Sequence, residues 1–190
     1  LPVKSVAEFI AFAKARPGKL YYASSGNGSS PHLAAEMFKA QAGINIVHVP
    51  YKGSPQAVTD LIAGEVSLVL LAPSTVMSYV QSGRLRALAV CGRQRSVAAP
   101  ELPTMAEAGL PGFEAGTWTA LLAPEGTAPD IVTRLNRGLT NILRAPDVRD
   151  RLAAQGFDAL SSTPAEFAAY LRSEIAKWGK VVKATGVRVD

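Results

Sequence analysis

Three short apolar segments, each followed by a loop of small residues and then a helical pattern, constrain this chain more than any other feature of its sequence. The segments run from Leu20 to Ser24, from Ile44 to Val49 and from Val66 to Leu71. Helical patterns follow from Pro31, from Pro55 to Ala63 and from Ser74 to Gln81. Strands and helices that alternate through short connections predict a mainly parallel sheet with helices on both faces. The predicted fold class is therefore α/β.

Capping residues predict where further helices begin. Ser5 with Glu8, Thr104 with Glu107 and Thr163 with Glu166 have the spacing of a capping box. Ser30 is the predicted N-cap before Pro31, because proline favours the first helical position. The predicted helices outside the alternating region span residues 5–16, a short stretch after Thr104, 129–143, 146–155 and 164–185, and two further strands are predicted at 84–91 and 113–123.

Length and composition exclude several classes of protein. The chain has 190 residues, of which 48% are hydrophobic and 18% charged, as in an ordinary globular domain. Its densest apolar run, Val66 to Ala72, is too short to cross a bilayer as a helix. The net charge of +5 comes from scattered Lys and Arg residues, so we expect no nucleic-acid partner. The single cysteine, Cys91, excludes an internal disulfide and is expected to be a buried, inert thiol.

No motif for catalysis or cofactor binding is evident. The hydrolase pattern G-x-S-x-G is missing, and Gly26-x-Gly28 is followed by Pro31 where the dinucleotide-binding pattern needs glycine. The two histidines, His32 and His48, are sixteen positions apart and do not have the spacing of a helical metal-binding pair. We therefore expect no catalytic residue, no metal and no cofactor.

Small polar residues gather where the predicted strands end. Ligands of open α/β sheets bind beyond the carboxyl ends of the strands, and a helix N-terminus there attracts an anion without any arginine. The same residues are also ordinary loop and cap residues, which is the structural alternative at each position. The predicted ligand-binding residues are Ser24, Ser25, Gly26, Gly28, Ser29, Ser30, His32, Tyr51, Lys52, Ala72 and Thr117. His48, Trp118 and Trp178 are expected to be mainly structural, although Trp118 and its neighbours lie where they could line a cleft.

Several segments together resemble one protein family. The runs Tyr22-Ala23-Ser24-Ser25-Gly26-Asn27-Gly28-Ser29-Ser30-Pro31-His32-Leu33 and His48-Val49-Pro50-Tyr51-Lys52-Gly53 are similar to the second lobe of the TctC or Bug solute receptors of tripartite tricarboxylate transporters. The similarity continues through residues 83–90, 102–112 and 122–127 in the order found in the family.

The resemblance implies a fold like that of type II periplasmic binding proteins, with two α/β lobes that close over a solute. On that basis residues 1–115 form the second lobe, and residues 116–190 form a crossing strand and C-terminal helices that complete the first lobe. The resemblance also implies that a first-lobe segment precedes Leu1 and carries a Gly-rich loop opposite residues 24–30. The chain alone is then expected to bind its ligand weakly. Apolar faces of its C-terminal helices are expected to be exposed in a monomer, which predicts a missing segment, a swapped dimer or a homodimer. These faces consist of Ile131, Leu135, Leu139 and Leu143, and of Phe167, Leu171 and Ile175.

For function, the resemblance implies a periplasmic receptor without enzymatic activity that hands a small organic acid to membrane transporter subunits. Apolar Leu71 and Ala72 disfavour an amino acid, which leaves a di- or tricarboxylate or an aromatic acid as the expected ligand. One alternative is a sensing module that reports carboxylate availability to a signalling partner. A carboxylate-handling enzyme is a third alternative, but neither a nucleophile nor a base is discernible.

Overall fold

The computed structural model describes residues 1–188 of the chain as an α/β protein, as the alternating pattern predicts. In chain order its elements are α1 (Val6–Lys14), β1 (Tyr21–Ser24), α2 (Ser30–Ala42), β2 (Val47–Pro50), α3 (Ser54–Ala63), β3 (Leu68–Val69), α4 (Pro73–Gln81), α5 (Pro129–Arg144), α6 (Pro146–Ala154) and α7 (Pro164–Thr185). Among these helices, none is both long enough and apolar enough to cross a membrane.

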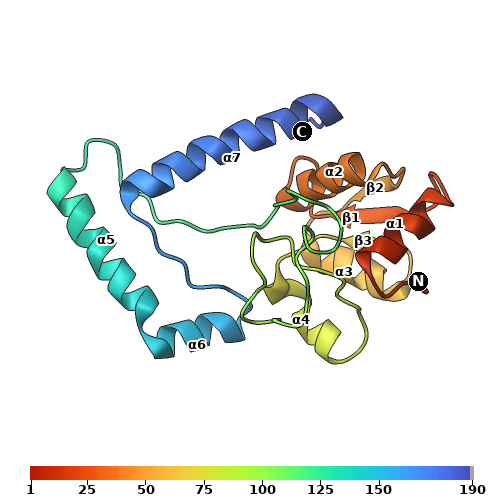
Figure 1. Cartoon of the computed structure of the whole chain (residues 1–190), viewed down its shortest axis with the longest axis horizontal. Coiled ribbons are helices and arrows are strands. Elements are labelled where there is room, and N and C mark those ends of the chain that lie inside the picture. The colour runs from red at the N-terminus through yellow and green to blue at the C-terminus, as the bar shows by residue number, and fades with distance from the viewer. Residues whose placement is uncertain (189–190) are drawn as a thin grey trace.

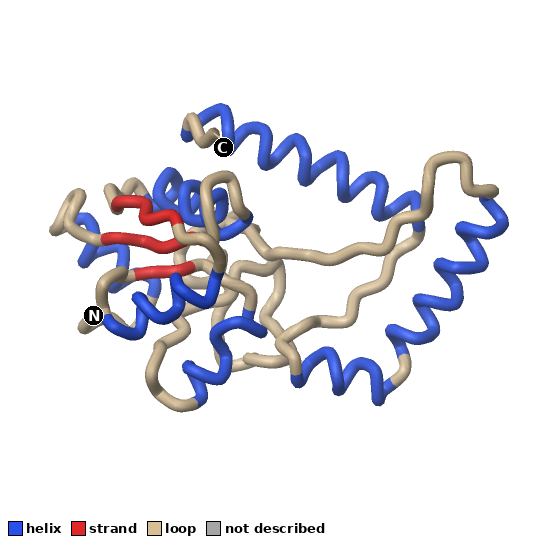
Figure 2. The backbone as a smooth tube through the Cα atoms, turned by 180° about the vertical axis from the view of Figure 1, so that it is seen from behind, coloured by secondary structure: helices blue, strands red, loops and turns tan. Residues whose placement is uncertain are grey.

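The three strands form one parallel sheet in the order β2-β1-β3 (Figure 2). In the register of the sheet, Tyr21 lies beside Val47 and Ser24 beside Pro50, so β1 and β2 end together. Because the strands are parallel, the loops that lead into α2, α3 and α4 all leave the same edge of the sheet. The sequence-based expectation that three strand ends meet at one edge is thus confirmed.

Alternate residues of β1 face two separate apolar clusters. Tyr22 is fully buried on one face, in a cluster that includes Phe9 of α1, Phe38 of α2 and Phe113. Ala23 points to the opposite face and packs with the buried residues Ala57 of α3 and Val66, which precedes β3. Because helices cover both faces of the sheet, Tyr22 and Ala23 are both buried although their side chains point in opposite directions.

Two of the three predicted capping boxes begin helices. Thr163 and Glu166 exchange both hydrogen bonds at the start of α7, and Ser5 Oγ accepts the Glu8 backbone N–H at 3.1 Å. The third pair makes the reciprocal bonds as well, with 2.8 Å from Thr104 N to Glu107 Oε2 and 3.1 Å from Glu107 N to Thr104 Oγ1. Only turns follow it, so the short helix predicted after Thr104 is wrong.

Two predicted strands are also wrong. In the region 84–91, Val90 makes only an isolated parallel bridge to Thr104. The segment 113–123 is extended but pairs with no strand among residues 1–188, and the side chains of Leu121 and Leu122 are each 76% exposed. The start of this segment does lie beside residues 91–92, because the Ala115 N–H donates to the Cys91 carbonyl at 2.9 Å. This contact does not extend into the ladder of hydrogen bonds that a strand requires.

Helices α5 and α6 lie apart from the sheet, joined to the rest by two extended connections (Figures 1 and 2). The first connection runs through residues 116–128 and the second through residues 155–163. The second connection is bound to the loop at residues 96–97. There Asp158 Oδ1 accepts hydrogen bonds from Val97 N at 3.0 Å and from Ser96 Oγ at 3.4 Å. Helix α7 then returns to pack against α2. The division of the chain near residue 115 stays a prediction.

Candidate functional site

The loop between β1 and α2 is held in shape from inside. Ser24 is fully buried, and its hydroxyl lies 3.0 Å from the Gly26 carbonyl oxygen and 3.2 Å from the Gly26 N–H. Gly26 adopts φ 133°, and a side chain there would also approach the Tyr51 carbonyl at 3.5 Å. Ser24 therefore supports the predicted binding loop from below and does not reach its surface.

Ser29, one residue before the predicted Ser30, is the N-cap of α2. Its hydroxyl donates to the Gly26 carbonyl at 2.7 Å and makes no capping hydrogen bond to the helix. Ser30 follows as an exposed residue in the first turn, ahead of Pro31. The start of α2 thus carries the partial positive charge of a helix N-terminus without a side-chain cap.

A stack of three rings lies beneath this loop. The rings of His32 and His48 are 3.8 Å apart and nearly parallel, and the ring of Tyr22 lies 4.8 Å from that of His48 on the sheet. His48 Nε2 is 2.7 Å from Ser24 Oγ, and His32 Nδ1 accepts the Gly28 N–H at 3.1 Å. His32, a predicted ligand residue, therefore already uses one ring nitrogen to hold the loop.

Both imidazoles favour the neutral form. Burial lowers the pKa of His48 to about 4, with a smaller contribution from the neighbouring His32. Burial also lowers the pKa of His32, against the opposing effect of Glu36. Two neutral rings can stack closely, whereas two charged rings would repel each other in this partly buried position. The pair is thus a support for the loop rather than a positive site for an anion.

Glu36 and Lys39, an ion pair on α2, are linked by hydrogen bonding to Tyr22 of the ring stack. Tyr22 Oη donates to Glu36 Oε1 at 2.5 Å, and Lys39 Nζ donates to the same oxygen at 2.5 Å. Burial, and then the hydrogen bond to Glu36, raise the pKa of Tyr22 well above its usual range. Tyr22 therefore remains a neutral donor and fixes the second turn of α2 against the central strand.

The other two loops at this edge hold the predicted site residues Tyr51, Lys52 and Ala72. Tyr51 Oη donates to Asp60 Oδ2 at 2.7 Å, and burial followed by this hydrogen bond raises the pKa of Tyr51 to about 12. Lys52 is exposed. Ala72 is the N-cap of α4, and Gly156 of the returning connection packs closely against the backbone of the next two residues. Each of the three loops thus keeps at least one exposed residue, namely Asn27 and Ser30, Lys52, and Ser74.

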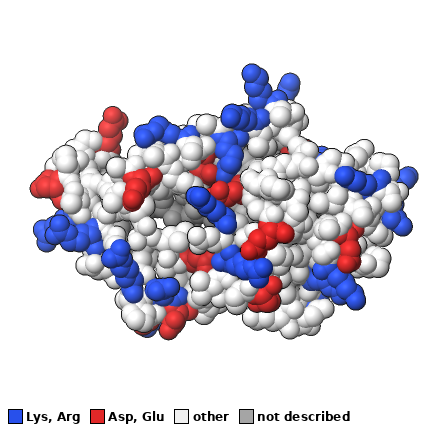
Figure 3. Space-filling model, in the orientation of Figure 1, with Lys and Arg blue, Asp and Glu red and all other residues white. Residues whose placement is uncertain are grey.

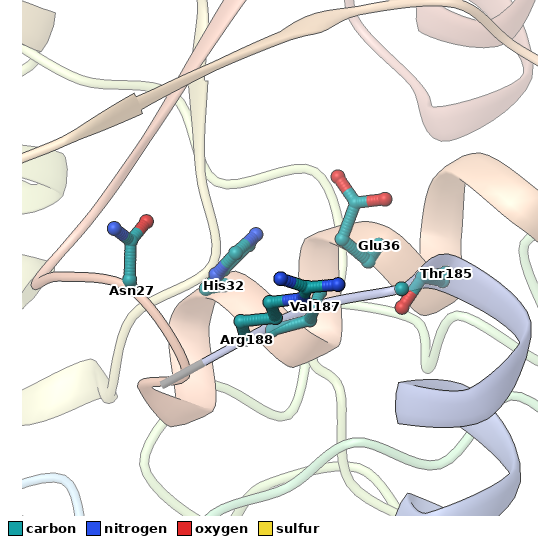
Figure 4. Close-up of a pocket in the computed structure, with 7 residues that line it drawn as sticks. Asn27, His32, Glu36, Thr185, Val187 and Arg188 are labelled. Atoms are coloured by element: carbon teal, nitrogen blue, oxygen red, sulfur yellow. The ribbon is translucent and has the colours of Figure 1, made fainter. Parts of the chain in front are cut away.

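Two cavities flank the first turns of α2. One of about 340 Å³ is lined by Ser30 and Leu33 of α2, residues 115–118 and Trp178 of α7. It brings together two predicted site residues, Ser30 and Thr117, that are far apart in sequence. The other, of about 380 Å³, lies between Asn27, His32 and Glu36 on one side and residues 185–188 on the other (Figure 4).

The sequence did not predict the place of Trp178 or Leu33 in a cavity. Trp178 was expected to be a packing residue, and it does contact the main apolar cluster while also forming a cavity wall. Nothing in the local sequence marks this second role, because it depends on how α7 returns across α2. Asn27 could have been found from its position inside the Ser-Gly loop.

Charges of both signs are mixed on the surface (Figure 3), and the described residues include no group arranged to hold a metal ion. Basic and acidic side chains are interspersed over the face shown in Figure 3. Within residues 1–188, no group of three or more His, Cys, Asp or Glu side chains is arranged to hold a metal ion. Cys91 is half-buried, and desolvation raises the pKa of its thiol to about 12, as expected for an unreactive cysteine. The site therefore offers backbone N–H groups, hydroxyls and aromatic surface.

Comparison with known proteins gives consistent matches. The profile of the family described as "Tripartite tricarboxylate transporter family receptor" (TctC) matches residues 1–187. Protein BugT of Bordetella pertussis is 40% identical over 189 residues, which are 100% of this chain and 58% of BugT. A UPF0065 protein of Pseudomonas knackmussii, from the clcB-clcD intergenic region, is 40% identical over 83% of this chain and 94% of its own length.

Solved structures match in the same way. The R. palustris protein Rpa4515, solved with adipate, superimposes with a TM-score of 0.85 at 38% identity and covers 98% of this chain. MatC from Rhodopseudomonas palustris, solved with bound malate, has a TM-score of 0.75 at 31% identity over 95% of this chain. The chain spans 62% and 63% of these two proteins and little more than half of several of the sequence relatives.

Proposed function

The chain belongs to the tripartite tricarboxylate transporter receptor (TctC) family, and on that premise we propose that the protein captures a small organic carboxylate in the periplasm for a membrane transporter. In this function the protein binds and releases its ligand unchanged. Opening and closing of two lobes about the extended connections would control access. Delivery then depends on transporter subunits that recognise the closed, loaded receptor.

The main support for this proposal is that α2 begins at the carboxyl edge of the sheet without a side-chain cap. An uncapped helix N-terminus preceded by Gly26, Gly28 and Ser29 suits a carboxylate, because backbone N–H groups and the helix dipole favour negative charge there. Ser30 and Thr117 add hydroxyl donors from two directions. Ser25, Tyr51, Lys52 and Ala72 stay predicted contacts at the same edge, and Ser24 and His32 are proposed to act by holding the loop.

Related proteins support an organic acid as the ligand. One structural neighbour was solved with adipate and another with malate, and both ligands are carboxylates. Apolar Leu71 and Ala72 at the end of the third strand segment offer no partner for an ammonium group. The proposed ligand class is therefore a di- or tricarboxylate or an aromatic acid rather than an amino acid.

Replacing Ser30 with leucine tests the position of the carboxylate. Ser30 is exposed and its side chain holds no part of the loop, so Ser30→Leu should leave the fold intact while it blocks the start of α2. We expect the affinity for the best-bound acid to fall at least tenfold in calorimetric titration of the native protein, because the lost contacts exceed about 1.4 kcal/mol. Ser82→Leu, at an exposed position after α4, is the matched control and should bind normally. Unchanged affinity in Ser30→Leu would remove this loop from the site.

A further inference from the structure

The cavity beside Ser30 differs in chemistry from the loop that it adjoins. Its walls are Leu33, Ala115 and the indoles of Trp118 and Trp178, and its polar groups are the hydroxyls of Ser30 and Thr117. Among the described residues, no charged side chain lines it. Its volume of about 340 Å³ lies at the lower end of the range for small-molecule sites. This cavity suits an uncharged, apolar group.

One buried carboxylate holds both tryptophans in place. Glu174 of α7 is only 5% exposed, and its Oε2 accepts hydrogen bonds from Trp178 Nε1 at 3.1 Å and from Trp118 Nε1 at 3.5 Å. Lys177 forms an ion pair with Glu174 and also donates to the Glu114 carbonyl at 3.0 Å. Both indole N–H donors are therefore engaged by the protein, which leaves hydrocarbon surface toward the cavity.

Ring contacts fix the orientation of Trp118 further. Its indole meets the rings of Phe167 and Tyr170 edge to face, with centroids 5.6 Å and 5.8 Å apart. Trp118 nevertheless remains 43% exposed, so part of the ring is not used for packing. A rigid aromatic ring that keeps an open surface is a favourable wall for a ligand, because little conformational freedom is lost on binding.

We propose that this cavity holds the hydrocarbon body of the bound acid while its carboxylate lies at the start of α2. The inference rests on the proposed function and narrows it to acids whose carboxylate carries an unsubstituted aliphatic or aromatic body. Ser30 connects the two parts, because it belongs both to the first turn of α2 and to the cavity wall. A short or heavily hydroxylated acid would leave the indole surfaces uncovered and gain nothing from them.

A homologous series of straight-chain acids tests the proposal. Acetate, butanoate and hexanoate are titrated into the native protein by calorimetry, with indole fluorescence recorded in parallel, and hexan-1-ol serves as the ligand without a carboxylate. We expect affinity to rise about two- to fourfold for each added methylene, the gain for burying one CH₂ group. Hexanoate should change the tryptophan emission, and acetate should not.

Two variants assign the effect to the cavity. In Trp118→Ala, affinity should no longer rise with chain length, so that hexanoate binds little better than acetate. Thr117→Lys should have the same effect, because it places a cation in an apolar cavity. Thr117 is exposed, so the fold should tolerate this substitution. Ile175→Ala is the control, because Ile175 is exposed on α7 and does not line the cavity. It should keep the wild-type dependence on chain length.

The outcomes separate this inference from the function on which it rests. Equal affinity for all three acids, or a dependence on chain length that survives in both cavity variants, would overturn the apolar site and leave the carboxylate receptor standing. Failure of all three straight-chain acids to bind, while a dicarboxylate or an aromatic acid still bound, would overturn the apolar site alone. Failure of the dicarboxylates, tricarboxylates and aromatic acids as well would overturn both proposals. If hexan-1-ol bound and changed the indole emission while no carboxylate of any kind bound, the apolar cavity would stand and the carboxylate function would fail.

Discussion

Ser24 and His48 meet at the end of the central strand, and the contact of 2.7 Å between them sets how the loop leaves the sheet. Both residues act on the loop from inside the protein, as does His32 through its bond to Gly28. The sequence predicted Ser24 and His32 as ligand contacts, and the structure places both side chains at the base of the loop between β1 and α2. Their burial could not be predicted from the sequence, because it depends on how β2 and α2 pack over them.

The neutral histidine pair makes stability depend on pH. The folded-state pKa of His48 is about 4, below the value of about 6.5 for an unfolded chain. Between these values the unfolded chain binds a proton that the folded chain does not, so stability is full above pH 6.5 and falls as the pH drops toward 4. We expect the free energy of unfolding by urea to decrease by roughly 2 kcal/mol over this interval, allowing for partial exposure.

The variant His48→Gln checks the origin of this dependence. Glutamine does not titrate and keeps a polar group near Ser24, so the slope of stability between pH 6.5 and 4 should become shallower even if the variant is less stable at pH 7. His32 should supply the part that remains, because its pKa is also lowered. An unchanged slope would show that other groups, such as carboxylates, dominate the acid response.

At the scale of elements, the connection that follows α6 packs tightly against the start of α4 at Gly156. Gly156 adopts φ 78° and packs against the start of α4, where an added Cβ would lie 2.9 Å from Ser74 N and 3.0 Å from Pro73 Cβ. Asp158 bonds to the loop at Val97 immediately afterwards. These contacts hold the return connection against the start of α4 and against the loop at residues 96–97.

Gly156→Ala should therefore be more costly than an ordinary glycine substitution. Gly126 is the matched control, since it has φ 80° and an added Cβ there meets nothing within 4 Å. We expect Gly126→Ala to destabilise the protein by about 1 kcal/mol through backbone strain alone, and Gly156→Ala by about 3 kcal/mol because overpacking is added. Equal losses in chemical denaturation would mean that the return connection is not held against α4.

Helix positions were more predictable from the sequence than strand positions. The prediction of α7 at 164–185 was confirmed at both ends, because Thr163, Pro164 and Gly186 are local signals that begin and end a helix. The strands at 84–91 and 113–123 were wrong because pairing depends on a neighbour elsewhere in the chain. The cavity at Trp118 and Trp178 was unpredictable for the same reason, since it requires α7 to return across α2.

At the scale of the whole molecule, one half is a packed α/β unit and the other presents apolar side chains to solvent. On α5, Ile131, Leu135 and Ile142 are exposed, and Leu121, Leu122 and Ile175 are exposed on the connection and on α7. Exposed apolar side chains that gather on one helix face are typical of an interaction surface. The predicted exposure of the α5 face is confirmed at Ile131 and Leu135, whereas Leu139 and Leu143 are partly covered.

We expect the isolated 190-residue chain to self-associate through these faces. Light scattering should give a mass above that of the 19.9 kDa monomer. Leu135→Glu should shift the mass toward the monomer because it places charge on the apolar face of α5, whereas Arg137→Glu should not, because Arg137 already presents charge to solvent. A stable monomer of the unmodified chain at high concentration would contradict the prediction.

The central claim is that the protein is a receptor for an organic acid, and calorimetric titration of the native protein tests it most directly. The panel consists of dicarboxylates, tricarboxylates, aromatic acids and amino acids, and each acid is recovered afterwards to check that it is unchanged. The structure and the family predict saturable binding of at least one acid, recovery of that acid intact, and no comparable binding of amino acids. Absence of binding by every acid, or chemical conversion of the acid that binds, would contradict the claim.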